Sequence, residues 1–344
     1  MKTLAAILVE SSAPLVVDEI DLPELQVGQV LVRIFRSGVC GAQINEINAI
    51  KGPDKFLPHL LGHEGGGVVE QIGPGVSQVK PGDKVVLHWK KGAGIHAAPA
   101  SYLWKGKKVN SGWVTTFSHH SIVSENRVTK IDNDGDFEVA ALMGCAVTTA
   151  LGLVNNDAHV KIGQSVAVLG AGGVGMSIVQ GAALAGAYPI IAIDKVDSKL
   201  ETAKQFGATH TINSQNSNLE AKIKEITGSG VVDAFIETTG NVRLIELAYK
   251  LTANQGRTVM VGVPRHDEDI TIHSLPLHFG KVLTGCEGGQ TNPTTDIPRY
   301  MRMVAGGRLK IKELITHRFP LAKVNDAITQ LKSGTAGRCM LVMD

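Results

Sequence analysis

The chain has 344 residues, of which 43% are apolar and 19% charged, a composition typical of a soluble globular enzyme with two domains. The formal net charge of +2 provides no general attraction to nucleic acid or to a membrane surface, so we expect neither as a partner. The apolar run before Glu10 has only six residues, Leu4–Val9, too few for a secretory or membrane-spanning segment. We therefore expect a cytoplasmic protein with reduced cysteines.

The N-terminal region, residues 1–146, is predicted to consist mainly of short β-strands. Runs of aliphatic and β-branched residues alternate with Gly/Pro turns such as "GPGVSQVKPGD", and helical periodicity is nearly absent. Examples of predicted strands are 29–38, 65–73 and 83–89.

From residue 147 onward, short apolar runs alternate with segments of helical spacing. This pattern predicts a parallel sheet covered by helices on both faces. The predicted strands are 165–170, 189–194, 210–213, 231–240 and 257–263, and the predicted helices are 174–187, 197–208, 219–228 and 244–252. After residue 288 two further helices and a final strand are expected to return to the first domain. The predicted domains are 1–146 with 288–344, and 147–287.

A glycine-rich turn follows the first strand of this alternation. The stretch "SVAVLGAGGVGMSIVQ" has G-x-G-x-x-G spacing between a predicted strand and a predicted helix, the context that a dinucleotide-binding motif requires. Asp194 ends the next strand about 20 residues later, where a carboxylate accepts hydrogen bonds from the adenosine ribose and repels a 2′-phosphate. We therefore expect NAD rather than NADP, although Lys195 and Lys199 weaken the preference. The predicted cofactor-binding residues of this region are Gly170, Gly172, Gly173, Val174, Gly175, Asp194 and Lys199.

Potential metal ligands occur at three places. Cys40 lies in a glycine-flanked stretch that we interpret as a loop, His63 and Glu64 lie in "LLGHEGGG", and Cys145 lies in "ALMGCAVTT". A Cys–His–Cys set suits zinc and leaves a fourth position open for water or substrate. Each residue alone has an ordinary interpretation, since a single cysteine is usually a small buried hydrophobe.

Taken with the glycine motif, these residues resemble the zinc-dependent alcohol dehydrogenases of the medium-chain dehydrogenase/reductase superfamily. The segment "GHEGGGVVEQIGPGVSQVKPGDKVV" is similar to the zinc-site segment of that family, and the resemblance extends over essentially the whole chain. It assigns the catalytic zinc ligands to Cys40, His63 and Cys145. It implies an α/β protein with a GroES-like β-rich catalytic domain and a Rossmann domain with a doubly wound parallel sheet.

The resemblance also implies roles for four other residues. Glu64 is the adjacent acid that approaches the zinc when water leaves, and Thr149 lies beside the nicotinamide. Arg338 reaches the cofactor pyrophosphate, unless it is a surface arginine before an edge strand. Trp89 lines the substrate pocket, unless it is ordinary core.

The chain departs from the family in residues 88–120, where many members carry four cysteines that hold a structural zinc. This segment has none, so we expect one catalytic zinc per subunit and no structural zinc. The segment contains lysines at 90, 91, 105, 107 and 108. It is either a solvated loop with a small apolar cluster or a border of the active site that favours a polar or anionic substrate.

A second departure affects the proton relay of the family. Ala42 occupies the substrate-pocket position where a serine or threonine is usual, Asn45 matches a relay histidine, and Gln43 matches an acid that supports the zinc-bound histidine. A substrate hydroxyl or water can carry the proton instead. Other candidates are His88, His119, His120 and Glu64. A third explanation is that the protein has drifted away from alcohol oxidation.

The leading hypothesis is a zinc- and NAD-dependent oxidoreductase that transfers a hydride between the CH–OH group of a polar or sugar-like alcohol and NAD, with an alcohol or its carbonyl counterpart as the small-molecule substrate. The alternatives are a zinc-free NADPH-dependent enone or quinone reductase of the same superfamily, and a non-catalytic cofactor-binding protein. The resemblance implies a homodimer or homotetramer, and residues 261–275 are a candidate interface strand pair or a solvated edge.

Overall fold

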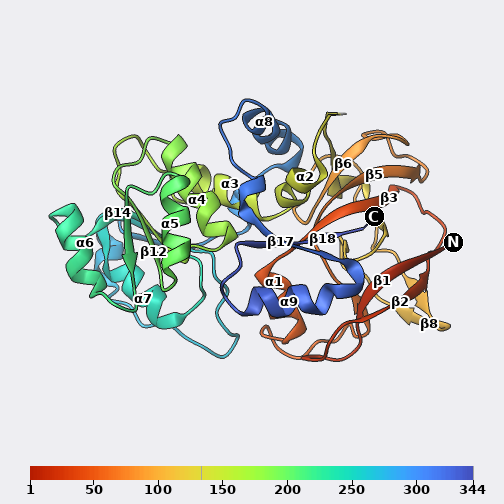
Figure 1. Ribbon diagram of the computed structural model, residues 1–344, viewed down its shortest axis with the longest axis horizontal. Coiled ribbons are helices and arrows are strands. Elements are labelled where there is room, and N and C mark those ends of the chain that lie inside the picture. The colour runs from red at the N-terminus through yellow and green to blue at the C-terminus, as the bar shows by residue number, and fades with distance from the viewer. Residues whose placement is uncertain (133, 344) are drawn as a thin grey trace. The chain divides into compact units, whose positions relative to one another are not determined.

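The computed structural model describes residues 1–132 and 134–343, which form two compact units. Unit 1 comprises Met1–Thr148 and the chain from Asn292 onward, and unit 2 comprises Thr149–Thr291 (Figure 1).

Unit 1 contains two sheets formed mainly by antiparallel pairs. The first has the order β4-β1-β2-β7-β8, and the second has the order β10-β6-β5-β3-β18-β17, with β9 also pairing with β3. The last strand, β18, pairs antiparallel with β3 and parallel with β17, so it is an internal strand of the second sheet. The strands are β1 (Lys2–Leu8), β2 (Val16–Asp21), β3 (Gln29–Val39), β4 (His59–Leu60), β5 (Glu64–Ile72), β6 (Lys84–His88), β7 (Tyr102–Trp104), β8 (Lys107–Val109), β9 (His120–Ser124), β10 (Val128–Lys130), β17 (Ile315–Pro320) and β18 (Arg338–Val342).

Short helices connect these strands. They include α1 (Gly41–Ile47), α2 (Phe137–Met143), α8 (Pro293–Ala305) and α9 (Val324–Lys332), and α3 (Ala146–Gly152) leads into unit 2. The 3₁₀ turns here are η1 (Glu125–Arg127), η5 (Lys312–Leu314) and η6 (Leu321–Lys323). Neither α1 nor α2 was predicted from the sequence, because a helix of seven residues makes about two turns and shows little periodicity.

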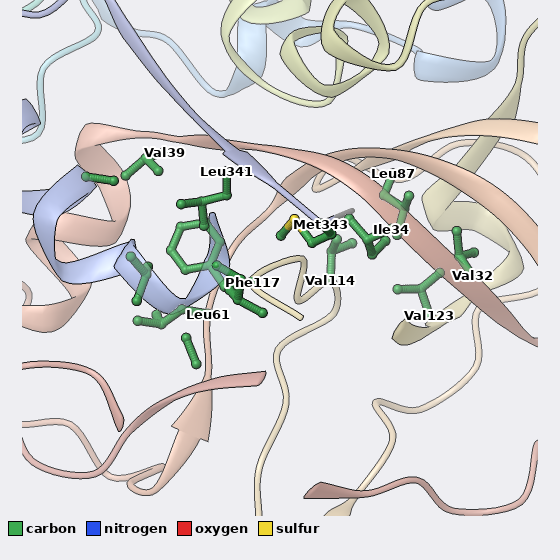
Figure 2. Packing of buried hydrophobic residues seen from close by; sticks show 14 of the residues in the cluster. Val32, Ile34, Val39, Leu61, Leu87, Val114, Phe117, Val123, Leu341 and Met343 are labelled. Carbon is green, nitrogen blue, oxygen red and sulfur yellow. The ribbon is translucent and has the colours of Figure 1, made fainter. Parts of the chain in front are cut away.

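The larger apolar core of unit 1 packs against the second sheet and is formed mainly by aliphatic side chains from segments far apart in sequence. Figure 2 shows Phe117, Leu61 and Leu341 grouped at one end of this core, with Ile34 and Val123 further along. The run Gly65–Gly67 in β5 lets other elements approach closely. A Cβ at Gly66 would lie 2.6 Å from the Phe137 carbonyl oxygen of α2.

Unit 2 contains a wholly parallel sheet with the order β13-β12-β11-β14-β15-β16. Figure 1 shows α4 and α5 on one side of this sheet and α6 and α7 on the other, which is the predicted doubly wound arrangement. The strands are β11 (Val166–Leu169), β12 (Ile190–Asp194), β13 (His210–Asn213), β14 (Val232–Glu237), β15 (Thr252–Met260) and β16 (Val282–Gly285), and the helices are α4 (Gly173–Leu184), α5 (Asp197–Gln205), α6 (Leu219–Thr227) and α7 (Val242–Lys250), with the π-turn η2 (Leu153–Asp157) and the 3₁₀ turns η3 (Leu275–Phe279) and η4 (Gly288–Gln290).

Local sequence signals explain where several helices begin. Asp136 accepts hydrogen bonds from the backbone N–H groups of Glu138 and Val139 at the start of α2, and Asn218 and Asn241 cap α6 and α7 in the same way. By contrast, the strand-pair interpretation of residues 261–275 is wrong, because residues 261–274 form no strand and Leu275 begins η3. Pro264 and the charged run 265–269 separate two short stretches of apolar alternation, so neither is long enough to establish a strand.

Within the described residues no single helix has the length and apolar character needed to span a bilayer. One bent pair, Phe137–Met143 with Ala146–Asp157, meets that test by length and composition alone.

Candidate metal centre and cofactor site

Cys40 is the N-cap residue of α1 and the single residue between β3 and α1, so the longer loop that the sequence suggested around it is wrong. Its backbone is extended, with φ −104° and ψ 153°, and the residue is 8% exposed. His63 immediately precedes β5, and Cys145 lies between α2 and α3. The second sheet of unit 1 and its flanking helices thus position all three residues.

These three side chains converge. The sulfur atoms of Cys40 and Cys145 and a ring nitrogen of His63 all lie within 4.8 Å of one another. A tetrahedral zinc with ligand bonds of about 2.0–2.3 Å requires ligand atoms about 3.5 Å apart, so small side-chain movements suffice to close the set. Nδ1 of His63 contacts Gln43, whereas Nε2 is buried without a hydrogen-bond partner in the described structure. An orphaned imidazole nitrogen beside two thiols fits a zinc ion well.

The environment of Cys40 favours its thiolate. Hydrogen bonding with Cys145 is the largest influence and holds the pKa of Cys40 well below its usual range, burial opposes this, and His63 and Arg338 add to the lowering. Metals bind thiolates rather than thiols, so this lowered pKa prepares Cys40 as a ligand.

Glu64 is completely buried and forms an ion pair with Arg338. Its other carboxylate oxygen accepts a hydrogen bond from the Ala146 backbone at 3.2 Å. Arg338 is 3% exposed at the start of the internal strand β18. The alternative interpretation of Arg338 as a surface residue before an edge strand is therefore wrong.

Two glycines make room for this buried ion pair. A Cβ at Gly38 would overlap the Glu64 carboxylate, and a Cβ at Gly144 would lie 2.7 Å from the Cα of Glu64. Neither glycine stands out in the sequence, because only the packed structure shows what each one faces.

Most candidates for the missing proton relay have other partners. His88 bonds to the Lys90 carbonyl and to Thr129, and His120 bonds to Thr3 and has its Nε2 3.4 Å from the Glu70 carboxylate. Ala42 is exposed on the first turn of α1, and Trp89 is partly buried with the Lys90 ammonium 5.5 Å from its ring centre.

Glu46 was not among the residues predicted from the sequence. It lies three residues after Gln43 on α1. Burial raises the pKa of its carboxyl group, and the charges of His59 and His63 oppose that rise. The sequence feature that could have identified Glu46 is its i, i+3 spacing from Gln43. This spacing places the two residues on one face only if residues 41–47 form a helix.

The segment 88–120 is bound into unit 1 by its own strands. Tyr102 and Val109 belong to the core of the first sheet, with Trp104 packed against it. Asp18 accepts a hydrogen bond from the Trp104 indole at 2.9 Å and pairs with Lys105. The strands β7 and β8 thus extend the first sheet, and Lys105 already has an acidic partner.

In unit 2 the glycine motif connects β11 to α4, as the sequence predicted. Gly170 has φ +98°, a conformation that favours glycine, and Gly172 is the N-cap of α4. A Cβ at Gly175 would overlap the Gly170 carbonyl oxygen, whereas a Cβ at Gly172 would meet nothing within 4 Å. The turn therefore leaves no room for a side chain at Gly175, where helix and strand pack, and is open at Gly172, where a phosphate would approach.

Asp194 ends β12 beside this turn. Its Oδ2 accepts a hydrogen bond from the Ala171 backbone at 2.7 Å, and its Oδ1 accepts one from Val196 at 3.0 Å. Lys199 lies in the first turn of α5 and is partly buried. The carboxylate is thus held at the carboxyl edge of the parallel sheet, where nucleotide-binding folds place their ligands.

Comparisons with known proteins agree over the full length. Residues 26–133 match the alcohol dehydrogenase GroES-like domain, and residues 173–306 match the zinc-binding dehydrogenase domain. S-(hydroxymethyl)glutathione dehydrogenase of Photobacterium damsela subsp. piscicida is 33% identical, covering 99% of this chain and 100% of the relative. Alcohol dehydrogenase 1 of Trifolium repens is 30% identical, covering 100% and 98%.

Solved structures are similar as well. The crystal structure of an alcohol dehydrogenase zinc-binding domain protein from Burkholderia ambifaria has a TM-score of 0.92 at 29% identity, covering 100% of this chain and 99% of that one. The benzyl alcohol dehydrogenase of Acinetobacter calcoaceticus has a TM-score of 0.90 at 27% identity, with both chains covered fully.

A GroES-like unit that carries a Cys–His–Cys cluster, joined to a parallel-sheet unit with a glycine turn, defines a medium-chain dehydrogenase/reductase. This confirms the predicted fold class and the resemblance. The chain belongs to the zinc-binding alcohol dehydrogenase family. It is an oxidoreductase of the alcohol dehydrogenase type that acts on small molecules.

Proposed function

We propose that the protein is a zinc- and NAD-dependent dehydrogenase that transfers a hydride between an alcohol CH–OH group and the nicotinamide. The observation that carries the proposal is the convergence of Cys40, His63 and Cys145, with His63 Nε2 buried and unpartnered. When bound there, zinc supplies a Lewis acid that stabilises an alkoxide or polarises a carbonyl.

We also propose one zinc per subunit. Cys40, His63 and Cys145 form the one candidate metal group of three or more ligands in the described residues, and the other two cysteines, Cys286 and Cys339, lie outside it. Glu64 is assigned as the acid adjacent to the zinc. Its carboxylate would leave Arg338 in order to approach the metal. Arg338 released in this way would be available to the cofactor pyrophosphate.

The chain's own residues would bind the cofactor in unit 2. The N–H groups that begin α4, in Gly173, Val174 and Gly175, offer donors for the pyrophosphate. The carboxylate of Asp194 would accept hydrogen bonds from the ribose hydroxyls and repel a 2′-phosphate, which supports NAD over NADP. Thr149, at the start of unit 2, is assigned to the nicotinamide.

For the substrate we propose a polar or sugar-like alcohol bound beside Ala42 and Trp89. Ala42 has no hydroxyl to accept the alcohol proton, and His88 and His120 are engaged elsewhere. A second hydroxyl on the substrate, or a water, would then pass the proton onward. Glu46 is a further acceptor, since partial desolvation raises the pKa of its carboxyl group.

The decisive test is a screen for NADH formation across alcohols and polyols, with NAD and with NADP, alongside zinc analysis of the purified protein. We expect NAD-dependent turnover and about one zinc per chain. Cys40→Ala should lose the zinc and at least about 100-fold in kcat/KM. Activity that survives this substitution would exclude the zinc mechanism, and NADPH-dependent reduction of an enone without zinc would establish the alternative reductase.

Ala42→Ser tests the missing relay. A restored hydroxyl is expected to raise kcat, because a general acid–base group contributes roughly 10²- to 10⁴-fold. Ala42→Val serves as a control for added bulk without a hydroxyl. An unchanged kcat for Ala42→Ser would show that another group already carries the proton.

We propose a homodimer or homotetramer. Large apolar side chains are exposed on η3 of unit 2, where Leu275 is 54% and Phe279 66% exposed. Light scattering of wild type and Phe279→Glu would test this, with a monomeric wild type as the contrary outcome.

A further inference from the structure

Gln43 contacts two of the three residues assigned to the metal. It is completely buried in α1. Its Oε1 accepts a hydrogen bond from the Cys40 backbone N–H at 2.8 Å, and its Nε2 lies against Nδ1 of His63. The two ends of one amide group are thus committed to two different neighbours.

These contacts determine the protonation of His63 in the metal-free protein. A backbone N–H is always a donor, so the amide oxygen must face Cys40 and the amide NH₂ must face His63. An amide nitrogen only donates, so Nδ1 accepts. The neutral ring then carries its proton on Nε2, the same atom that is buried without a partner beside the two sulfurs.

Metal binding requires the opposite arrangement. A nitrogen that binds zinc must present its lone pair, so Nε2 loses its proton and Nδ1 carries one. The Nδ1–H would then face the NH₂ of Gln43, donor against donor. If the amide turned over, its NH₂ would instead face the N–H of Cys40. One amide oxygen cannot serve both donors, whereas the two oxygens of a carboxylate would serve both.

We propose that Gln43 is a positioning residue that holds His63 in the tautomer whose Nε2 is protonated and cannot bind metal, so that zinc binds there only when the Gln43 amide gives up one of its two contacts. The consequence is a site with weaker zinc affinity, and easier zinc exchange, than the same site with a carboxylate at position 43. This inference rests on the proposed zinc site. Substitution of a residue that hydrogen-bonds to a metal-bound histidine typically changes metal affinity roughly 10- to 100-fold.

The first test is zinc affinity, measured by competition with a chromogenic chelator. Wild type is compared with Gln43→Glu and with Asn45→Asp. The second substitution adds the same charge to α1 but keeps the Gln43 amide. We expect Gln43→Glu to bind zinc roughly 10- to 100-fold more tightly and Asn45→Asp to remain within about 3-fold of wild type. Equal affinities of Gln43→Glu and wild type would overturn the inference and leave the zinc function standing.

The second test reads the tautomer without zinc. The ring nitrogens of ¹⁵N-histidine-labelled apo protein report their protonation by NMR, with His63→Gln identifying the signal. We expect the proton of His63 on Nε2 in wild type and on Nδ1 in Gln43→Glu. A proton on Nδ1 in wild type would overturn the inference even if Gln43→Glu failed to fold. No zinc uptake by any variant would overturn this inference and the proposed function together.

Discussion

His88 is buried in β6, and both of its ring nitrogens are engaged by neighbours. Nδ1 lies 2.8 Å from the Lys90 carbonyl oxygen, and Nε2 lies 2.9 Å from the Thr129 hydroxyl. Burial lowers the pKa of His88 to about 4, with smaller opposing and reinforcing effects from hydrogen bonds and Arg127. The residue is therefore a neutral structural histidine at physiological pH, and a poor proton acceptor for catalysis.

This lowered pKa predicts a pH-dependent loss of stability. The unfolded state takes up a proton near pH 6.5 and the folded state only near pH 4. The unfolded state thus binds more protons in this window, and stability falls as pH falls through it, by about 3 kcal/mol for this residue. Urea unfolding from pH 7 to pH 4 should show a shallower decline for His88→Gln. Parallel curves for the two proteins would contradict the prediction.

Arg127 presents a different anomaly among the buried residues. It is 4% exposed, its Nε is buried without a hydrogen bond, and no acidic side chain of the described chain pairs with it. Its guanidinium lies 5.7 Å from the ring centre of Trp113. Burial lowers its pKa, as expected for a charge removed from water without an ionic partner.

We expect Arg127→Met to stabilise the protein by about 1 kcal/mol or more, because an apolar chain of similar length fills the site without burying a charge. Arg127→Lys is the matched control, since it keeps the charge and should give no gain. Urea unfolding at pH 7 measures both. A large destabilisation by Arg127→Met would show that the guanidinium has a partner in solution.

Between elements, two glycines of the β11–α4 connection have different roles. Gly175 permits helix and strand to pack, because a Cβ there would overlap the Gly170 carbonyl oxygen. Gly172 faces open space and has φ −80°, which any residue can adopt. A Cβ at Gly172 would intrude only on a ligand.

The two alanine substitutions should therefore have different effects. Gly175→Ala is expected to destabilise the protein by about 1–3 kcal/mol through overpacking. Gly172→Ala should change stability by no more than about 1 kcal/mol but weaken NAD binding at least about 10-fold, because the added methyl group meets the pyrophosphate. Thermal unfolding and NADH fluorescence titration measure these effects. Unchanged NADH affinity in Gly172→Ala would place the pyrophosphate elsewhere.

Elements were predictable in proportion to their length and regularity. Apart from β16, which was not predicted, the strands and the helices α4 to α7 of unit 2 follow from alternation alone, and the predicted strand 210–213 coincides with β13. In unit 1 the sequence indicated the strands but not α1 or α2. Seven residues do not establish a period, and α2 is buried on nearly every side, so it lacks the polar face that marks an amphipathic helix.

In the whole molecule, unit 2 is one continuous stretch of chain inserted into the sequence of unit 1, and its first and last segments are hydrogen-bonded to each other. Near its start, Asn156 donates to the Gly289 carbonyl at 2.8 Å, and Asp157 accepts from Gln290 at 2.7 Å. It has its own apolar core, which includes Phe235, Ile191 and Ile223. A unit with joined ends and a separate core is expected to fold alone.

We therefore expect a fragment comprising residues 149–291 to unfold cooperatively and to retain NADH binding, as judged by circular dichroism and fluorescence. A fragment carrying Gly175→Ala is the control and should unfold at lower denaturant concentration. A fragment without a cooperative transition would show that unit 2 depends on unit 1.

The sequence by itself determined the parallel sheet and the glycine turn, since these depend on local spacing and on periodicity along the chain, and its resemblance to known proteins indicated the family. It also identified Cys40, His63 and Cys145 as a candidate set, although spacing alone could not show that they meet. Only the tertiary structure brought them within 4.8 Å of one another, paired Glu64 with Arg338 and placed Gln43 between Cys40 and His63. The physical reason is that each of these contacts joins segments that are distant in sequence or depends on which atom of a side chain faces which neighbour.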